Sequence, residues 1–196
     1  SDLRKLRQNE NNANRRVARL IHANWPMGSG VLLELDYSPE GILALTGGEA
    51  YDPQDESRWD TVLEAAKHQL SNYIRRVQRA CRKQGIELRY LAFTSDLRFD
   101  GKLREHVHTR IHHHLVVNPE AAELCKAAWR LGGAGDRRMK KTADHTDLAC
   151  YLMDQCRRIG EEKKYTPSRN LRKAKEYAPR VSSTSSEVQP PRGAIL

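Results

Sequence analysis

The sequence predicts an α+β protein, with an antiparallel β-sheet of about five strands, helices packed on one face and the other face free for a substrate. Residues 30–37 alternate apolar and charged positions, which is typical of a strand with one buried face. Residues 59–81 repeat apolar positions three or four apart, as an amphipathic helix does. The predicted strands are joined by connections of hairpin length, which favours an antiparallel sheet.

Residues 1–19 are polar and basic, and we interpret them as an arm or a helix that orders on DNA. Residues 30–37 (GVLLELDY) form the first predicted strand, with its apolar side chains on one face and Glu34 and Asp36 on the other. The turn-like segment SPEG then leads into residues 42–45 (ILAL), which we predict to be a second strand.

The long helix follows, with an apolar stripe from Trp59 to Cys81 and Gly85 in the usual capping position. Asn118 and Pro119 indicate the start of another helix, because an N-cap residue is followed by a first-turn proline. The remaining predicted elements are strands at 86–94, 107–117 and about 137–142, and helices at 118–129 and about 144–158.

A chain of 196 residues has the usual length of one domain with tails. We expect a basic arm or helix at 1–19, one domain at 20–177, and a disordered tail at 178–196, where large apolar residues are rare. No secretory signal and no run of about 18 apolar residues is visible. The four cysteines form no CxxC pair, so we expect reduced thiols in a cytoplasmic protein with no membrane contact.

The net charge of +9 favours a polyanionic partner. The cations gather near both ends of the chain and leave its middle nearly balanced, which indicates a contact surface for nucleic acid. They include Arg4, Lys5, Arg7, Arg15, Arg16 and Arg19 near the start, and Arg157, Arg158, Lys163, Lys164, Arg169, Arg172, Lys173 and Lys175 near the end.

His112 and His114 are two positions apart in a predicted strand, so they share a face, with Cα atoms about 6 to 7 Å apart. Two imidazoles in this arrangement can bind one divalent cation between them. His113 points to the opposite face, where we interpret it as a structural residue. Candidates for a third ligand are Glu34, Asp36, Asp96, Asp154 and Gln155.

Tyr151 and Gln155 are four positions apart and therefore lie one above the other on a helix face. If this helix packs against the sheet, a phenol and an amide oxygen arrive beside His112 and His114. Nitrogen ligands with a side-chain oxygen accept Mg²⁺ or Mn²⁺, although they also suit zinc.

Four segments, in this order, resemble the HUH endonucleases, specifically the replication initiators (Rep proteins) of rolling-circle phages and plasmids. They are NW…VLLELDY, the His-hydrophobe-His strand RIHHHLVV, the helix DLACYLMDQ, and YTPSRNLRK. The resemblance covers most of residues 17–175 and implies an HUH/ferredoxin-like nuclease fold. It also implies His112 and His114 as metal ligands and Tyr151 as the nucleophile.

One departure from this pattern concerns the third ligand. Initiators of this group often carry a lysine three or four residues after the tyrosine, where this chain has Asp154 and Gln155. The spacing Tyr-x-x-x-Gln is similar instead to the single-tyrosine transposases of the same superfamily, in which the glutamine binds the metal. We therefore predict Gln155 as the third ligand, Asp96 as the alternative and Asp154 after it.

The resemblance implies metal-dependent nicking and joining of single-stranded DNA at a specific sequence or structure. Tyr151 would form a 5′-phosphotyrosine, with Mn²⁺ or Mg²⁺ as the cofactor, and rejoining would need no ATP. The expected role is initiation of rolling-circle replication in the cytoplasm of a prokaryotic host, in association with the nucleoid. The expected partners are origin DNA, unpaired or folded as a hairpin, and replication proteins such as a helicase.

The predicted contacts to the DNA backbone are Lys164, Arg169, Arg172, Lys173 and Arg157. Tyr165 is a second candidate nucleophile, and Tyr151 is preferred because a helix would hold its hydroxyl more firmly than a loop. We interpret Trp25 and Tyr37 as core residues before base-stacking ones. Three alternatives stay open: a transposase-like strand transferase, a non-catalytic DNA-binding module, and a zinc-stabilised domain that uses His106, His108, His112 or cysteines.

Overall fold

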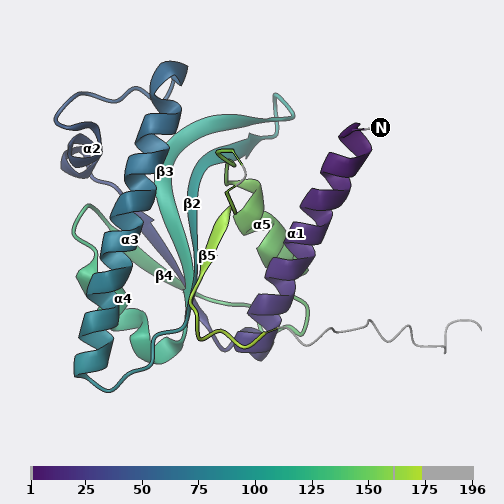
Figure 1. Cartoon of the computed structure of the whole chain (residues 1–196), viewed down its shortest axis with the longest axis vertical. Coiled ribbons are helices and arrows are strands. Elements are labelled where there is room, and N and C mark those ends of the chain that lie inside the picture. The colour runs from purple at the N-terminus through teal and green to yellow at the C-terminus, as the bar shows by residue number, and fades with distance from the viewer. Residues whose placement is uncertain (1, 161, 174–196) are drawn as a thin grey trace, which may run out of the picture.

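The computed structural model is built around one five-stranded antiparallel sheet with the strand order β4-β1-β3-β2-β5 (Figure 1). The structure describes residues 2–160 and 162–173, so the predicted tail at 178–196 and the predicted end of the domain at 174–177 lie outside the described residues. The strands are β1 Val31–Asp36, β2 Tyr90–Asp100, β3 Glu105–Val117, β4 Ala134–Arg138 and β5 Tyr165–Pro167. The predicted α+β class with about five antiparallel strands is therefore confirmed.

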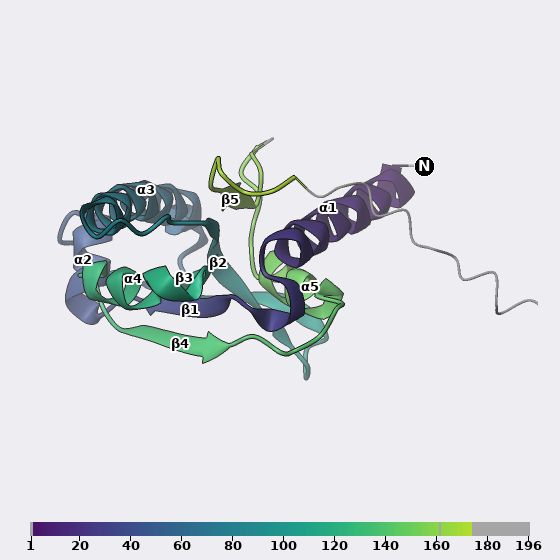
Figure 2. The ribbon, with the colours of Figure 1, turned by 90° about the horizontal axis from the view of Figure 1, so that it is seen from below.

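The helices lie on both faces of the sheet, whereas the sequence predicted them on one face only (Figure 2). The helices are α1 Asp2–Asn24, α2 Pro39–Thr46, α3 Trp59–Lys83, α4 Ala122–Ala128 and α5 Thr146–Asp154, with single 3₁₀ turns η1 Pro26–Gly28, η2 Glu56–Arg58 and η3 Pro119–Ala121. None of the helices in the described part of the chain is long and apolar enough to cross a membrane.

The first face of the sheet is covered by α3 and α4. Their apolar residues pack on inward-facing side chains of β1, β2 and β3, such as Leu33, Ala92 and Leu115. Of the apolar stripe predicted for residues 59–81, the part from Leu70 to Cys81 faces this core, and Val62, Leu63 and Ala66 belong to a separate small cluster. Helix α2 packs against α3 beside it, where Leu45 contacts Val62 and Leu63.

The second face carries a second apolar core beneath α1 and α5. Leu32, Leu91 and Val116 alternate with residues of the first face and would be exposed without these two helices. The burial of this second apolar row explains why the prediction of one uncovered face was wrong.

Residues 2–24 form one continuous helix, so the predicted boundary between residues 19 and 20 falls inside α1. The first half of α1 is exposed and stands clear of the sheet, whereas Val17, Ile21 and the following Trp25 are completely buried in the second core (Figure 1). Trp25 is thus a core residue, as predicted.

Three predicted elements differ from the structure. Residues 42–45 lie in α2, because Ser38 caps the helix by accepting a hydrogen bond from the Gly41 amide and Gly47 ends it in the left-handed region. Strand β2 begins at Tyr90 and continues to Asp100 through a segment predicted as a loop. Strand β4 lies at 134–138, earlier than predicted. Residues 42–45 were predicted as a strand because the period of a short apolar run does not distinguish a helix from a strand.

Candidate active site

The alternation of β3 places His112 and His114 on the face that α1 and α5 cover, and His113 on the opposite face. The rings of His112 and His114 lie 4.8 Å apart, centroid to centroid. Their register partners on the neighbouring strand β1 are Asp36 and Glu34, which lie on the same face of the sheet. The shared face that the period of two predicts is therefore present.

His113 is a structural residue, as its position in the sequence predicted. Its ring is completely buried, with the Tyr37 hydroxyl 2.6 Å from Nε2 and the Thr94 hydroxyl 2.9 Å from Nδ1. A neutral imidazole donates to one hydroxyl and accepts from the other, so both nitrogens are satisfied. Burial lowers the pKa of His113 to about 3, and the ring therefore stays neutral.

His114, unlike His113, is buried without hydrogen bonds to its ring nitrogens. It is 1% exposed, and neither ring nitrogen makes a hydrogen bond to any residue that the structure describes. Burial, with smaller contributions from His112 and Arg137, lowers its pKa to about 3. A neutral, buried imidazole with unpaired nitrogens is costly unless a ligand satisfies it. His114 therefore has the properties of a metal ligand.

Helix α5 brings Tyr151 and Gln155 to these two histidines. Ala149, Leu152 and Met153 anchor the helix in the second core. The Tyr151 ring lies 5.9 Å from the His114 ring, centroid to centroid, and the tyrosine is 47% exposed, so its side chain is accessible from solvent.

Gln155 and His112 face each other through two hydrogen-bond acceptors. Gln155 Oε1 lies 3.2 Å from His112 Nε2, while His112 Nδ1 lies 3.0 Å from the Arg110 carbonyl oxygen. A neutral imidazole carries one N–H, and the Arg110 carbonyl requires it on Nδ1. Turning the amide over would lose its donation to the Tyr151 carbonyl oxygen. A cation between Nε2 and Oε1 would satisfy both acceptors.

A β-bulge holds Gln155 in this position. The pairing of β2 with β3 shifts between Ser95 and Leu97, and the backbone N–H groups of Asp96 and Leu97 both donate to the Gln155 carbonyl oxygen, at 3.2 and 3.1 Å. The bulge thus ties the end of α5 to the sheet. Sequence reasoning missed this role of β2, because the segment was predicted as a loop.

Glu34 is the carboxylate beside the histidines. Its Oε2 atom lies 3.6 Å from His114 Nε2 and 3.3 Å from an Arg137 guanidinium nitrogen. Glu34 was one of the candidates for the third ligand, and Gln155 was preferred to it because of the Tyr-x-x-x-Gln spacing. Asp36 is exposed on the same face, opposite His112.

Comparisons with protein-family models, curated proteins and solved structures found no match to this chain. The resemblance to HUH endonucleases therefore depends on the motifs in the sequence. Across residues 2–160 and 162–173, no three His, Cys, Asp or Glu side chains lie close enough together to hold a metal ion. The Gln155 amide, which lies beside His112, is a further oxygen donor next to the two histidines.

Two other predicted ligands are engaged elsewhere. Asp96 is 1% exposed and its Oδ2 atom lies 2.8 Å from Arg157 Nε, and Asp154 forms an ion pair of 2.7 Å with His106. Burial raises the pKa of Asp96, while the Arg157 hydrogen bond opposes this shift. In this structure Asp96 and Asp154 are thus paired with cations, whereas Gln155 lies beside His112, and the identity of the third ligand stays a prediction.

The histidines of the zinc alternative are also engaged. His108 stacks on Trp59 with ring centroids 4.1 Å apart, and its Nε2 lies 2.8 Å from the Tyr51 hydroxyl. His106 is paired with Asp154, and the four cysteines are scattered, with three of them buried. These contacts do not favour a structural zinc site.

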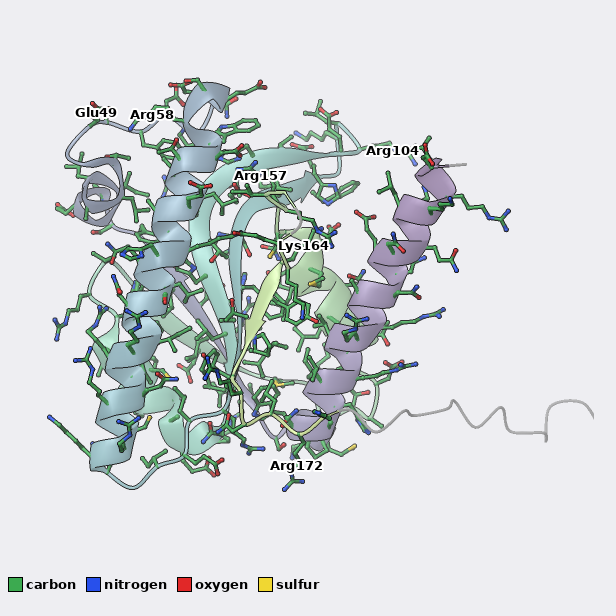
Figure 3. All side chains as sticks on the ribbon, in the orientation of Figure 1. Glu49, Arg58, Arg104, Arg157, Lys164 and Arg172 are labelled. Atoms are coloured by element: carbon green, nitrogen blue, oxygen red, sulfur yellow. The ribbon has the colours of Figure 1, made fainter. Side chains whose placement is uncertain are left out.

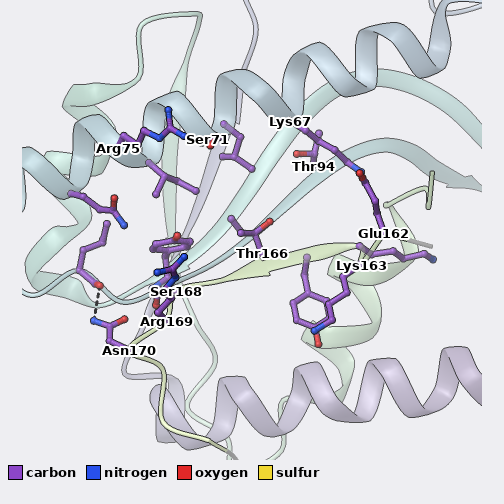
Figure 4. A pocket seen from close by; sticks show the side chains of 18 residues that line it. Lys67, Ser71, Arg75, Thr94, Glu162, Lys163, Thr166, Ser168, Arg169 and Asn170 are labelled. Atoms are coloured by element: carbon purple, nitrogen blue, oxygen red, sulfur yellow. Dashed lines mark hydrogen bonds and ion pairs between the residues drawn. The ribbon is translucent and has the colours of Figure 1, made fainter. Parts of the chain in front are cut away.

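The predicted DNA contacts fall into three groups. Arg157 pairs with Asp96 and with Asp60, each at 2.8 Å, and lies over the Trp59 ring, so its guanidinium is engaged within the protein. Arg172 and Lys173 line a hollow beside α1, and Lys164 and Arg169 line a cleft next to β5. Figure 3 labels Arg172 and Lys164, and Figure 4 shows the cleft with Arg169. The contact of these four residues with DNA stays a prediction.

Tyr165, the second candidate nucleophile, is a core residue. It is 8% exposed, belongs to the second core and packs near Phe93, with ring centroids 6.4 Å apart. Tyr151 is consequently the better candidate.

Proposed function

We propose that this protein is a metal-dependent endonuclease and strand transferase that nicks and rejoins single-stranded DNA through Tyr151. The proposal depends on one observation above all: the exposed Tyr151 phenol lies on the same side of the sheet as a buried imidazole with unpaired nitrogens and a pair of opposed acceptors. The resemblance to HUH endonucleases supports the same chemistry.

The residues that would hold a divalent cation are His112, His114 and Gln155. Their donor set of two neutral nitrogens and one amide oxygen suits Mn²⁺ and is compatible with Mg²⁺. When bound, such an ion would withdraw negative charge from the scissile phosphate. Glu34, which lies 3.6 Å from His114, would add negative charge beside the cation.

Tyr151 supplies the nucleophile. Its phenolic oxygen attacks phosphorus, a Tyr–O–P bond forms, and the P–O3′ bond breaks. The phenolic proton passes to solvent water, the leaving oxygen takes up a proton from water as a free 3′-hydroxyl, and the phosphate stays on Tyr151. Because one phosphodiester replaces another, attack by a 3′-hydroxyl reverses the step without ATP.

The substrate of this proposal is single-stranded. The chain carries a net charge of +9. When cationic side chains contact the phosphates of a DNA strand, the affinity for DNA falls steeply as the salt concentration rises. The resemblance favours origin DNA of a phage or plasmid and a cytoplasmic setting in a prokaryotic cell, with a replication helicase as a protein partner. The position of Gln155 beside His112 favours the metal-ligand arrangement of the single-tyrosine transposases, so a transposase-like reaction is the second candidate.

The proposal is tested with labelled single-stranded oligonucleotides tiled across the DNA that encodes and flanks this protein. Incubation with Mn²⁺ and a denaturing gel should reveal a covalent adduct, and peptide mapping should place it on Tyr151. Tyr151→Phe should abolish the adduct and preserve DNA binding, whereas Tyr165→Phe should retain it. An adduct that survives Tyr151→Phe contradicts the proposal, and DNA binding with no adduct from any oligonucleotide indicates a non-catalytic module.

A further inference from the structure

A second cleft lies on the sheet face opposite Tyr151, between α3 and β5 (Figure 4). Its volume is about 620 Å³, within the usual range for ligand sites. The floor is formed by alternate residues of β2, namely Tyr90, Ala92 and Thr94. Thr94 hydrogen-bonds to His113, which points away from His112 and His114, so the cleft and the candidate active site occupy different faces.

One wall of the cleft is a single stripe of α3. Lys67, Ser71, Arg75 and Gln78 are three or four residues apart and all line it. At about 1.5 Å of rise per residue, this stripe is roughly 16 Å long. The cleft is therefore elongated along the helix, and it can follow a chain-like ligand.

The opposite wall is the segment around β5, which contributes further cations. Five cationic residues line the cleft, and they are Lys67, Arg75, Lys163, Lys164 and Arg169. The acidic residue among the lining residues is Glu162, which pairs with Lys67 at 3.2 Å. Positive charge thus exceeds negative charge in a confined space, which favours an anionic ligand.

The deeper part of the cleft is apolar. Leu70, Ile74, Leu88 and Tyr90 line it between the two cationic walls. An apolar floor with cationic walls matches the two parts of a nucleotide, because the base has an apolar face and the phosphate carries the charge. The volume fits nucleotide units and is too small for a duplex.

We propose that this cleft binds a segment of single-stranded DNA that flanks the nicked phosphate, with its phosphates at Arg75, Lys164 and Arg169 and a base over the apolar floor. The identity of the ligand rests on the proposed function, and the cleft itself does not. The bound strand would pass around the β5 edge of the sheet and be held on both faces.

The test measures DNA binding without cleavage, in the Tyr151→Phe background. Fluorescence anisotropy with a labelled single-stranded oligonucleotide gives the dissociation constant over a series of salt concentrations. Arg75→Gln with Arg169→Gln should weaken binding and reduce the slope of log affinity against log salt by about 1.4, at about 0.7 for each phosphate contact. The matched control is Arg82→Gln with Lys83→Gln, which removes the same charge from the exposed end of α3, outside the cleft.

A second variant tests the cleft without removing a cation. Ser71 is exposed on the α3 wall, and Ser71→Glu adds a negative charge there with little risk to folding. Gln84→Glu adds the same charge at the exposed end of α3. Ser71→Glu should weaken binding of the oligonucleotide and Gln84→Glu should not.

Equal effects of the cleft variants and their controls would overturn the inference. A second experiment acetylates the protein chemically and asks which ligand protects Lys163 and Lys164. If dTMP protects these lysines and the oligonucleotide does not, the inference is also overturned, because the cleft would then be a site for free nucleotides. The expected result is protection by the oligonucleotide at concentrations where dTMP gives none. Failure of the wild-type protein to nick DNA contradicts the proposed function and leaves these binding results unaffected.

Discussion

Gln155 Oε1 lies 3.2 Å from His112 Nε2, and when the His112 ring is neutral the surrounding hydrogen bonds leave both atoms as acceptors. Two facing acceptors repel each other, and a cation bound between them would be coordinated by both. Nearby, the nitrogens of His114 have no hydrogen-bond partner among the described residues. These relationships generate the first prediction.

Mn²⁺ should stabilise the folded protein through His112, His114 and Gln155. At a concentration 100 times its dissociation constant, the ion should add about 2.7 kcal/mol to the free energy of unfolding. Gln155→Leu should weaken Mn²⁺ binding at least about tenfold, because an amide ligand is replaced by an apolar group. Thermal unfolding over a Mn²⁺ titration measures this.

The control for this prediction is His68→Gln, since His68 is exposed on α3 and does not belong to the candidate site. It should respond to Mn²⁺ as the wild-type protein does. Identical Mn²⁺ stabilisation in wild type and Gln155→Leu would exclude Gln155 as a ligand.

In the absence of metal, acid should destabilise the protein through His113 and His114. Burial lowers the pKa of each to about 3, and an unfolded histidine has a pKa near 6.5. Between these values the unfolded chain binds more protons, so the stability is complete above pH 6.5 and falls as the pH falls toward 3.

Each of these two histidines should contribute about 1.4 kcal/mol per pH unit well inside that window. Urea unfolding in EDTA at several pH values between 7 and 4.5 measures the slope. His114→Gln should remove one of the two contributions. A slope that His114→Gln leaves unchanged would show that His114 is charged or exposed in solution.

We expect Arg157 to contribute to the free energy of unfolding and not to bind DNA directly. Its guanidinium pairs with Asp96, which is 1% exposed. Arg157→Leu would leave a buried carboxylate without its partner and should cost about 3 to 5 kcal/mol. Urea unfolding should also show that Asp96→Asn combined with Arg157→Leu recovers much of this loss, and strictly additive losses would contradict the pairing.

Gly132 and Gly133 form a matched pair for backbone packing. A Cβ atom on Gly132 would overlap the carbonyl oxygen of Asp36, whereas one on Gly133 would meet nothing within 4 Å. Gly132→Ala should therefore destabilise the protein by about 1 to 3 kcal/mol, and Gly133→Ala should have little effect. Equal unfolding midpoints in urea for the two variants would argue against the close approach of this loop to β1.

The features that follow from local spacing were predictable. The period of two in β3 assigns His112 and His114 to one face and His113 to the other, and the spacing of four places Tyr151 above Gln155 on one side of α5. The stripe that predicted α3 has the same local origin. These patterns need no knowledge of which segments become neighbours in space.

The features that depend on neighbours were not predictable in the same way. The sequence offered both Asp96 and Glu34 as candidate ligands. In the structure the strand order places Glu34 beside His114, and Asp96, at the bulge in β2, pairs with Arg157. The second apolar row of the sheet draws α1 and α5 onto the face that was expected to be open. Spacing along the chain determines which way a side chain points, but its partners depend on strand order, register and the helices that bury each face, and these arise only when distant segments pack together.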